Sequence, residues 1–285
     1  MSHFQLAIAA RERLVGAGIP PDQAAIDAEV LSRHALGWDR ASWLARREEP
    51  ASPEEEARLH SLVARRERRE PVAYITGRRE FWGLDFEVTS AVLIPRPETE
   101  FIVEAALEKL DGSVQPWQVA DVCTGSGCLA IVLAHERPHV VVTATDISAA
   151  ALQVARRNAE RHQVADRITF LESSLLDEVS GPFDLIVANP PYVPQAMREH
   201  LQSDVKDYEP GVAIFGDGAD GLDQARALIR QAPSRLVQGG WLMMEFGFGQ
   251  AESIAAAVGA VPELTLVEIL RDLQRHERTL VARRR

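Results

Sequence analysis

The stretch Val119-Ala120-Asp121-Val122-Cys123-Thr124-Gly125-Ser126-Gly127 decides the fold of this 285-residue chain. Its mostly apolar first four residues predict a buried strand, and the glycine-rich run predicts a tight loop at the start of a helix over residues 129–136. A second apolar run, residues 140–144, leads to Asp146. A strand, a helix and a second strand in this order predict a βαβ unit, and therefore a parallel sheet.

The same alternation continues toward the C-terminus. Further helices are expected over residues 148–162, 222–237 and 250–258. Further strands are expected over residues 168–171, 184–188, 241–246, 264–270 and 279–282. We therefore predict an α/β fold with a doubly wound, mostly parallel sheet of seven strands.

The first 79 residues have a different pattern. Apolar residues recur at helical spacing, and Ser52-Pro53-Glu54-Glu55 forms a capping box with proline at the first helical position. Residues 1–79 are therefore predicted to be a small helical bundle that docks a substrate, with the charged run 65–70 as a solvated helix face. Residues 80–95 alternate and contain a glycine, which predicts a β-hairpin linker. The α/β domain then covers residues 96–285.

Charge is distributed unevenly along the chain. Residues 1–80 carry thirteen Arg and thirteen Asp or Glu, so the net charge of -11 falls on the remainder. An acidic α/β half argues against a partner held mainly through phosphates, so we expect no direct nucleic-acid binding.

The cysteine content and the hydropathy pattern favour a cytoplasmic protein. Only Cys123 and Cys128 occur, and the eight His residues are scattered, so we expect no metal site and a reduced, cytoplasmic setting. No apolar run reaches membrane-spanning length, and the first residues lack the apolar core of a signal peptide. We therefore expect no membrane partner, and we expect a monomer.

A second informative stretch, Asn189-Pro190-Pro191-Tyr192, follows the strand expected over residues 184–188. Ligands bind at the carboxyl edge of open α/β sheets, where this rigid turn is expected to lie. The carbonyl oxygens of the Asn189 side chain and the Pro190 backbone are two acceptors that suit a planar NH2 group. Anchoring both N–H bonds of such a weak nucleophile turns its lone pair toward an electrophilic methyl group, and Tyr192 would pack its ring against the planar group or a methyl sulfonium. The pattern favours methyl transfer to an amide or amino nitrogen over a purely structural turn.

The glycine loop predicts a nucleotide-type cofactor site. Gly125 and Gly127 let the backbone pass close to a ligand at a helix N-terminus, and Asp146 ends the next strand, where a carboxylate accepts ribose hydroxyls. Because Ala130 follows Gly127 by three residues, the loop also fits a dinucleotide fingerprint, and a nicotinamide oxidoreductase is an alternative. No His, Lys or Tyr is clearly placed to relay a proton during hydride transfer, which favours a methyltransferase.

Taken together, these stretches resemble the release-factor glutamine methyltransferase family (PrmC/HemK type), over nearly the whole chain. The resemblance rests on residues 70–77, 80–83, 94–100, 121–127, 189–192 and 245–247. Asn-Pro-Pro-Tyr alone is shared with DNA adenine methyltransferases, whereas Arg96-Pro97-Glu98-Thr99-Glu100 is far more specific. The resemblance implies a methyltransferase sheet, S-adenosyl-L-methionine as methyl donor and S-adenosyl-L-homocysteine as product. It implies as acceptor the side-chain N5 of the glutamine in the Gly-Gly-Gln loop of class I peptide chain release factors.

The resemblance also assigns roles to residues. The cofactor-binding residues that it implies are Cys123, Thr124, Gly125, Ser126, Gly127, Asp146, Ser174 and Asn189. The implied substrate-binding residues are Asn189, Pro190, Pro191 and Tyr192, and the catalytic ones among them are Asn189, Pro190 and Tyr192. The second-rank site residues are Arg96, Pro97, Thr99, Glu100 and Glu245. No metal ligand is implied.

Three positions depart from the family pattern. Cys123 stands where glycine is usual, which predicts a slightly less open loop, and Arg275 stands where glycine is common, which predicts a shifted surface turn. Ser173-Ser174 occupies the place where an acidic residue often borders the adenine.

Two other functions remain open from the sequence. A nucleic-acid adenine methyltransferase would share both motifs, but it would need a basic groove or a target-recognition segment. A non-catalytic module for translation factors would bind its partner without consuming the donor.

Overall fold

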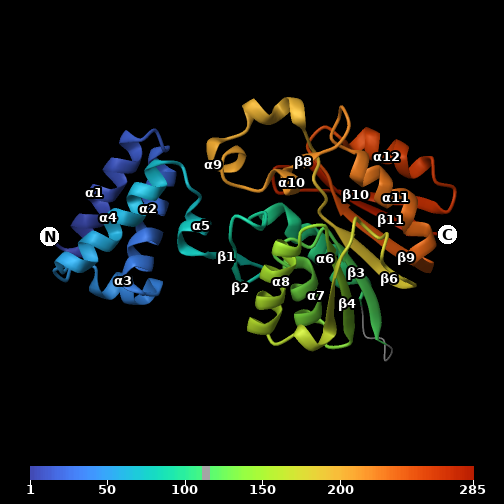
Figure 1. Cartoon of the computed structure of the whole chain (residues 1–285), viewed down its shortest axis with the longest axis horizontal. Helices are drawn as coiled ribbons and strands as arrows, with labels where there is room; N and C mark the ends of the chain where they lie inside the picture. The colour runs from blue at the N-terminus through green and yellow to red at the C-terminus, as the bar shows by residue number, and fades with distance from the viewer. Residues whose placement is uncertain (111–115) are drawn as a thin grey trace. The chain divides into compact units, whose positions relative to one another are not determined.

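The computed structural model describes residues 1–110 and 116–285, which form two compact units (Figure 1). The first unit combines Met1–Arg78 with Gln202–Tyr208, and the second combines Arg79–Leu201 with Glu209–Arg285. The segment Gln202–Tyr208 therefore belongs to the N-terminal unit although it lies far along the sequence.

The first unit is a helical bundle, as predicted. Its helices are α1 (His3–Gly16), α2 (Pro21–Leu36), α3 (Arg40–Arg46), α4 (Pro53–Glu67), α5 (Val72–Thr76) and α9 (Ser203–Lys206). The predicted capping box is present, because Ser52 Oγ accepts from Glu55 N while Glu55 Oε2 accepts from Ser52 N. The apolar faces meet in a core that includes Leu14, Leu31 and Val63.

The prediction of a solvated face over residues 65–70 is wrong for Arg66. This side chain is buried, and its guanidinium donates to Asp27 Oδ2 from Nε at 2.7 Å and to Asp204 Oδ2 from Nη1 at 3.1 Å. A buried cation needs such partners to stay charged. The sequence pattern could not show the pairing with Asp204, which lies 138 residues away.

The second unit is built on a seven-stranded sheet, which confirms the predicted fold class. The strands, in spatial order, are β10 (Leu264–Arg271), β11 (Glu277–Arg284), β9 (Leu236–Glu245), β6 (Phe183–Ala188), β3 (Trp117–Val122), β4 (Val140–Asp146) and β5 (Ile168–Glu172). The five strands from β9 to β5 are parallel, and β11 pairs antiparallel with both β9 and β10. Two small sheets accompany it, formed by β1 (Arg78–Phe81) with β2 (Leu84–Glu87) and by β7 (Val193–Pro194) with β8 (Phe215–Gly216).

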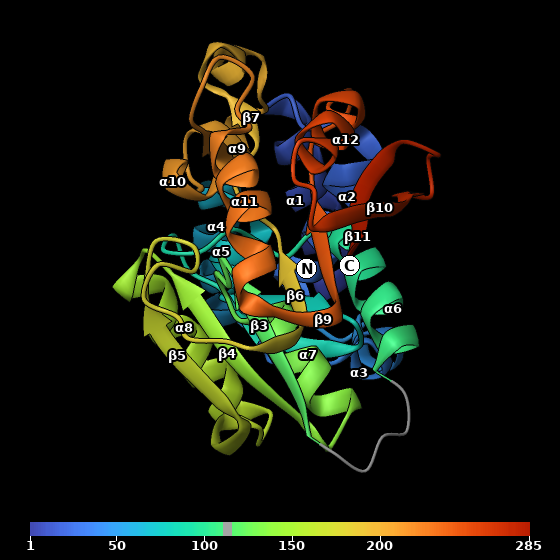
Figure 2. The same cartoon turned by 90° about the vertical axis from the view of Figure 1, so that its right-hand side faces the viewer.

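Helices cover both faces of the sheet (Figure 2). They are α6 (Glu100–Lys109), α7 (Cys128–Glu136), α8 (Ala149–Arg161), α11 (Asp223–Arg235) and α12 (Ala251–Gly259). In β6, Leu185 and Val187 pack in one core with α6, α7 and α8, while Ile186 and Ala188 pack in another with α11 and α12. This alternation follows from the two-residue period of a strand, and it makes the sheet doubly wound.

A long excursion, residues 193–222, lies between the Asn-Pro-Pro-Tyr turn and α11, and its elements were not predicted from the sequence. It contains β7, the 3-10 helix η3 (Gln195–His200), α9, α10 (Gly211–Ile214) and β8. Two further 3-10 helices are η1 (Pro97–Thr99), which leads into α6, and η2 (Ala165–Arg167), which precedes β5. Among the helices of the described residues, none is both long and apolar enough to cross a membrane.

Candidate functional site

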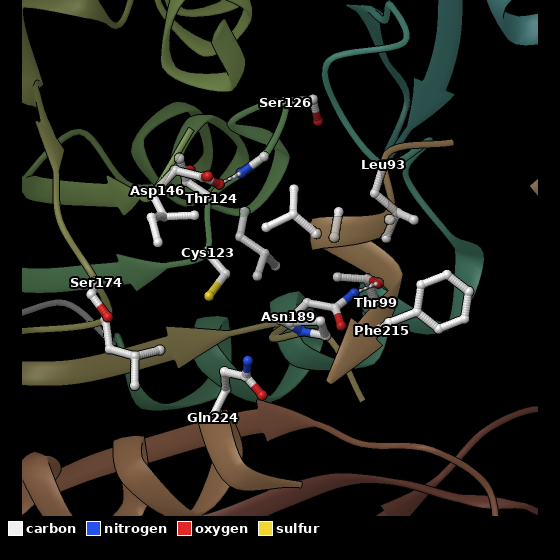
Figure 3. Close-up of a pocket in the computed structure, with 18 of the residues that line it drawn as sticks. Leu93, Thr99, Cys123, Thr124, Ser126, Asp146, Ser174, Asn189, Phe215 and Gln224 are labelled. Carbon is white, nitrogen blue, oxygen red and sulfur yellow. Dashed lines mark hydrogen bonds between the residues drawn. The ribbon is translucent and has the colours of Figure 1, made fainter. Parts of the chain in front are cut away.

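A cavity of about 580 Å³ opens at the carboxyl edge of the parallel strands in the second unit. The predicted site residues that line it are Arg96, Thr99, Cys123, Thr124, Gly125, Ser126, Asp146, Ser174, Asn189 and Pro191. Figure 3 shows Cys123, Asp146 and Asn189 around the same space. The glycine loop after β3 and the Asn-Pro-Pro-Tyr turn after β6 therefore face one cavity.

The open part of the glycine loop is at Gly125. Its φ is +55°, and a Cβ built there would meet no atom within 4 Å. Gly125 N donates to Asp146 Oδ2 at 2.9 Å, and Ser148 N donates to Asp146 Oδ1 at 2.9 Å. Burial raises the pKa of Asp146, against the opposing effect of these backbone hydrogen bonds. Since each carboxylate oxygen has two lone pairs, Asp146 keeps acceptor capacity for hydroxyl groups in the cavity.

Gly127, which was expected to contact the cofactor, is not among the residues that line the cavity. Its φ is +84°, and a Cβ there would lie 3.1 Å from the Cβ of Ala155 in α8. Glycine is required at this position by the packing of α7 on α8, in addition to the turn. Cys123 lines the cavity and also has a positive φ, of 61°. Burial raises the pKa of the Cys123 thiol well above its usual range, so the thiol stays protonated and is a weak nucleophile.

Asp121 supports the site from beneath, and the sequence analysis gave it no role. It is completely buried in β3, and its Oδ2 accepts from Thr124 Oγ1 at 2.5 Å and from Ala130 N at 3.0 Å. Within residues 1–110 and 116–285 its Oδ1 has no hydrogen-bond partner, and burial raises the pKa of Asp121 to about 7. The signal that marks it in the sequence is an acidic residue inside an otherwise apolar strand.

The Asn-Pro-Pro-Tyr turn is anchored on its inner side. Asn189 Nδ2 donates to Thr99 Oγ1 at 3.0 Å, as Figure 3 shows, and Thr99 Oγ1 donates to Glu245 Oε2 at 2.6 Å. The hydroxyl of Tyr192 donates to Glu245 Oε1 at 3.0 Å. Pro190 and Tyr192, for which substrate contacts through the Pro190 backbone oxygen and the Tyr192 ring were expected, are not among the residues that line the cavity.

The family stretch 96–100 divides between two tasks. Arg96 and Thr99 line the cavity, whereas Pro97 begins η1 and Glu100 Oε1 accepts from Trp82 N at 2.9 Å. Glu245 lies at the end of β9 and does not line the cavity.

The sequence analysis missed Glu209, the buried partner of Arg96. Glu209 Oε1 accepts from Arg96 Nη2 at 2.5 Å, and its Oε2 accepts from Ile94 N at 3.0 Å. No local pattern marks Glu209, which lies 113 residues from Arg96.

One wall of the cavity comes from the excursion and from α11. Val212, Phe215 and Gln224 line it there, and Figure 3 shows the last two facing the space beside Asn189. The sequence does contain a signal for this wall, namely the length of the segment between β6 and α11, because connections of that length are usually functional. Ser173 and Ser174 also line the cavity, and Ser173 N donates to the backbone oxygen of Asp146.

Metal chemistry has no candidate centre in the described part of the chain. Within residues 1–110 and 116–285, no group of three or more His, Cys, Asp or Glu side chains is arranged to hold an ion.

Comparison with known proteins gives matches along the chain. The family model described as the PrmC N-terminal domain matches residues 5–77, and the methyltransferase small domain matches residues 99–204. A release factor glutamine methyltransferase of Geobacter sulfurreducens is 47% identical over 234 residues, covering 82% of this chain and 80% of that protein. One from Cereibacter sphaeroides is 42% identical over 276 residues, covering 96% of each.

Solved structures show the same fold in more distant proteins. A methyltransferase from Pyrococcus furiosus matches with a TM-score of 0.52 at 18% identity, covering 71% of this chain and 90% of that one. At that identity the likeness concerns the fold alone. The identity to the curated relatives over most of both chains carries the assignment: this chain belongs to the release factor glutamine methyltransferase family.

Proposed function

We propose that this chain transfers a methyl group from S-adenosyl-L-methionine to the side-chain N5 of the glutamine in the Gly-Gly-Gln loop of class I peptide chain release factors. One observation carries the proposal: Asn189 and the glycine loop line the same cavity. Relatives that bear the name of this activity support the choice of substrate.

The residues present fit the methyl donor. Gly125 leaves open space beside the backbone, and the Asp146 carboxylate faces the cavity with acceptor capacity left. Thr124 and Gly125 would hold the methionine part of the donor, and Asp146 would hold its ribose. When bound, the donor supplies an electrophilic methyl group on a sulfonium.

The chain's own contribution is to position the acceptor nitrogen. Asn189 Oδ1 and the Pro190 backbone oxygen would accept the two N–H bonds of the glutamine amide, which holds the nitrogen lone pair toward the methyl group. The amide nitrogen becomes strongly acidic once it is methylated, so it can release its proton to water. A general base in the turn is therefore not required.

The remaining assignments extend the proposal beyond the cavity. The helical domain, residues 1–79, would dock the release factor, the hairpin at residues 80–95 would link the domains, and residues 96–285 would carry the chemistry. The enzyme would act in the cytoplasm as a monomer, without direct contact to nucleic acid. Membership of the family does not support the oxidoreductase and nucleic-acid methyltransferase alternatives.

Asn189→Ala tests the proposal by removing one of the two amide anchors. We expect turnover on a release factor to fall about 100- to 1000-fold, as for loss of one preorganised hydrogen-bonding group, with donor affinity little changed. The measurement uses labelled donor, a purified release factor and mass spectrometry to locate the label. A release factor with Ala in place of the loop glutamine is the control and should take up no label. Near-normal turnover of the variant, or label on another residue, would contradict the proposal.

A further inference from the structure

A chain of hydrogen bonds runs from the cavity into the interior. It links Asn189 Nδ2 to Thr99 Oγ1 at 3.0 Å and Thr99 Oγ1 to Glu245 Oε2 at 2.6 Å. The second oxygen of Glu245 accepts from the Tyr192 hydroxyl at 3.0 Å. Thr99 is 2% exposed and Glu245 is 1% exposed, so water competes little for the bond between them.

The carboxylate at the end of the chain fixes the direction of every bond in it. A carboxylate only accepts, so the Thr99 hydroxyl gives its single proton to Glu245 and offers a lone pair to Asn189. A lone pair is satisfied only by a donor, so the nitrogen of the Asn189 carboxamide must face Thr99. The oxygen Oδ1 is then left as the end of the amide that is available to a ligand in the cavity.

We infer that Thr99 and Glu245 are positioning residues, which hold the Asn189 carboxamide so that its oxygen is the group offered to the substrate. The inference rests on the proposed function, in which that oxygen accepts an N–H of the glutamine. Without the Thr99 hydroxyl, the carboxamide can turn over and present its NH2 group. Two hydrogen-bond donors, the NH2 group of Asn189 and the NH2 group of the substrate, would then face each other.

Glu245 also holds the other end of the same turn. Its bond to Tyr192 and its bond to Thr99 fix the turn on both sides of the two prolines. Burial raises the pKa of Glu245, whereas the hydrogen bonds from Thr99 and Tyr192 oppose that rise by stabilising the ionised form. The neighbouring charges are Glu98, which adds to the rise, and Arg278, which opposes it.

The chain offers a matched control for the Thr99 hydroxyl. Thr279 stands directly opposite Glu245 in the β9–β11 pairing and is 0% exposed, but its Oγ1 has no hydrogen-bond partner among the residues that the structure describes. Thr99→Val and Thr279→Val therefore make the same chemical change at two buried positions, the second of which pairs with Glu245 across the strands. Only the first breaks the chain to Asn189.

The test is steady-state methylation of a release factor by the full-length variants, with donor affinity measured by calorimetry. We expect Thr99→Val to lower kcat about 10- to 100-fold, while Thr279→Val stays within about twofold of the unchanged protein. Thr99→Ser restores the hydroxyl and should recover kcat to within about threefold. Donor affinity should change by less than about twofold in Thr99→Val, because the hydroxyl acts on the acceptor side.

A double-mutant cycle separates positioning from a general structural role. If Thr99 acts only through Asn189, adding Thr99→Val to Asn189→Ala should cost no further turnover. Additive losses, equal losses in Thr99→Val and Thr279→Val, or unchanged kcat in Thr99→Val would overturn the inference.

Two further results complete the design. Should Thr99→Val fail to fold, Glu245→Gln provides a second test. A carboxamide of equal size can donate as well as accept, so the hydrogen bonds to Thr99 and Asn189 can reverse. We expect kcat to fall at least about tenfold, and an unchanged kcat would overturn the inference. Failure of the proposed function can be told apart from failure of this inference, because in the first case the unchanged protein itself would label no glutamine.

Discussion

At the scale of single residues, two carboxylates hold the glycine loop from neighbouring strands. Asp121 in β3 accepts from Thr124 and from Ala130, at either end of the turn into α7. Asp146 in β4 accepts from Gly125 in the middle of the loop. The loop shape thus depends on these acceptors as much as on its glycines, and one of them, Asp146, also lines the cavity.

Asp121→Asn should flatten the dependence of stability on pH. Burial raises the pKa of Asp121 from 3.8 to about 7. Between these values the folded protein retains a proton that the unfolded chain releases, so the free energy of unfolding falls as pH rises through this window. Asparagine has no such proton. Urea unfolding without the methyl donor should therefore show a smaller fall in the free energy of unfolding between pH 4 and pH 7 for the variant than for the unchanged protein. An unchanged drop would exclude Asp121 as its source.

Asp146→Ala should weaken donor binding. Loss of charge-assisted hydrogen bonds to the ribose is expected to cost about 1.5–3 kcal/mol, or a roughly 10- to 150-fold higher Kd by calorimetry. Asp166→Ala removes the same charge from an exposed position in η2 and serves as the control. Equal affinities in the two variants would speak against the ribose role.

At the scale of elements, α8 joins the glycine loop to the hairpin. Asn158 of α8 is fully buried, and its Nδ2 donates to the backbone oxygens of Ser126 and Glu87, at 2.9 and 3.0 Å. Its Oδ1 accepts from Glu87 N at 2.7 Å. The hairpin β1–β2 is therefore tied to the element that supports the cavity, and the loop is held by α8 as well as by its own strand.

Gly127→Ala should destabilise the junction of α7 and α8. The new Cβ would lie 3.0 Å from Ile131 Cδ1 and 3.1 Å from Ala155 Cβ, at a φ of +84°. Backbone strain and overpacking together should lower the free energy of unfolding by about 2–4 kcal/mol. Gly249→Ala is the matched control, because its φ is +81° and no atom lies within 4 Å of its Cβ. Thermal and urea unfolding should show the larger loss for Gly127→Ala; equal losses would mean that packing adds nothing.

At the scale of the whole molecule, the excursion after the Asn-Pro-Pro-Tyr turn serves both units. Its residues 202–208 belong to the N-terminal unit, where Asp204 pairs with Arg66. Its next residue, Glu209, belongs to the second unit and holds Arg96 at the cavity. The first unit therefore includes a short piece of chain that is inserted between two parts of the second unit's sequence.

Arg66→Met should destabilise the first unit. It leaves the buried carboxylate of Asp27 without its cation, which typically costs about 3–5 kcal/mol. Arg46→Met removes the exposed pair with Glu49 and should destabilise the protein much less, because water screens that pair. Urea unfolding followed by the fluorescence of the tryptophans, which include buried Trp43, gives both losses. Similar losses in the two variants would show that burial does not strengthen the Arg66 pair.

Local patterns located most elements to within a few residues. Apolar runs with branched side chains marked all seven strands of the large sheet, and the capping box at Ser52 marked the start of α4. The two motifs were placed at one sheet edge because parallel strands end on the same side. The excursion was missed because its short elements lack periodic apolar faces, and Glu209 was missed because its partners are remote in sequence.

The α/β class, the helical N-terminal unit and the two motifs that line the cavity could all be predicted from the order of the residues. These depend on side-chain periodicity and turn chemistry, which act between residues close in the chain. The direction in which the Asn189 amide faces, the charge partners of Arg66 and the need for glycine at position 127 become visible only in the folded chain. Each of these features depends on a neighbour that folding brings close. Glu245 orients the Asn189 amide through Thr99, Asp204 pairs with Arg66, and Ala155 leaves no room for a side chain at Gly127. Burial then makes such contacts strong, because water no longer competes for them.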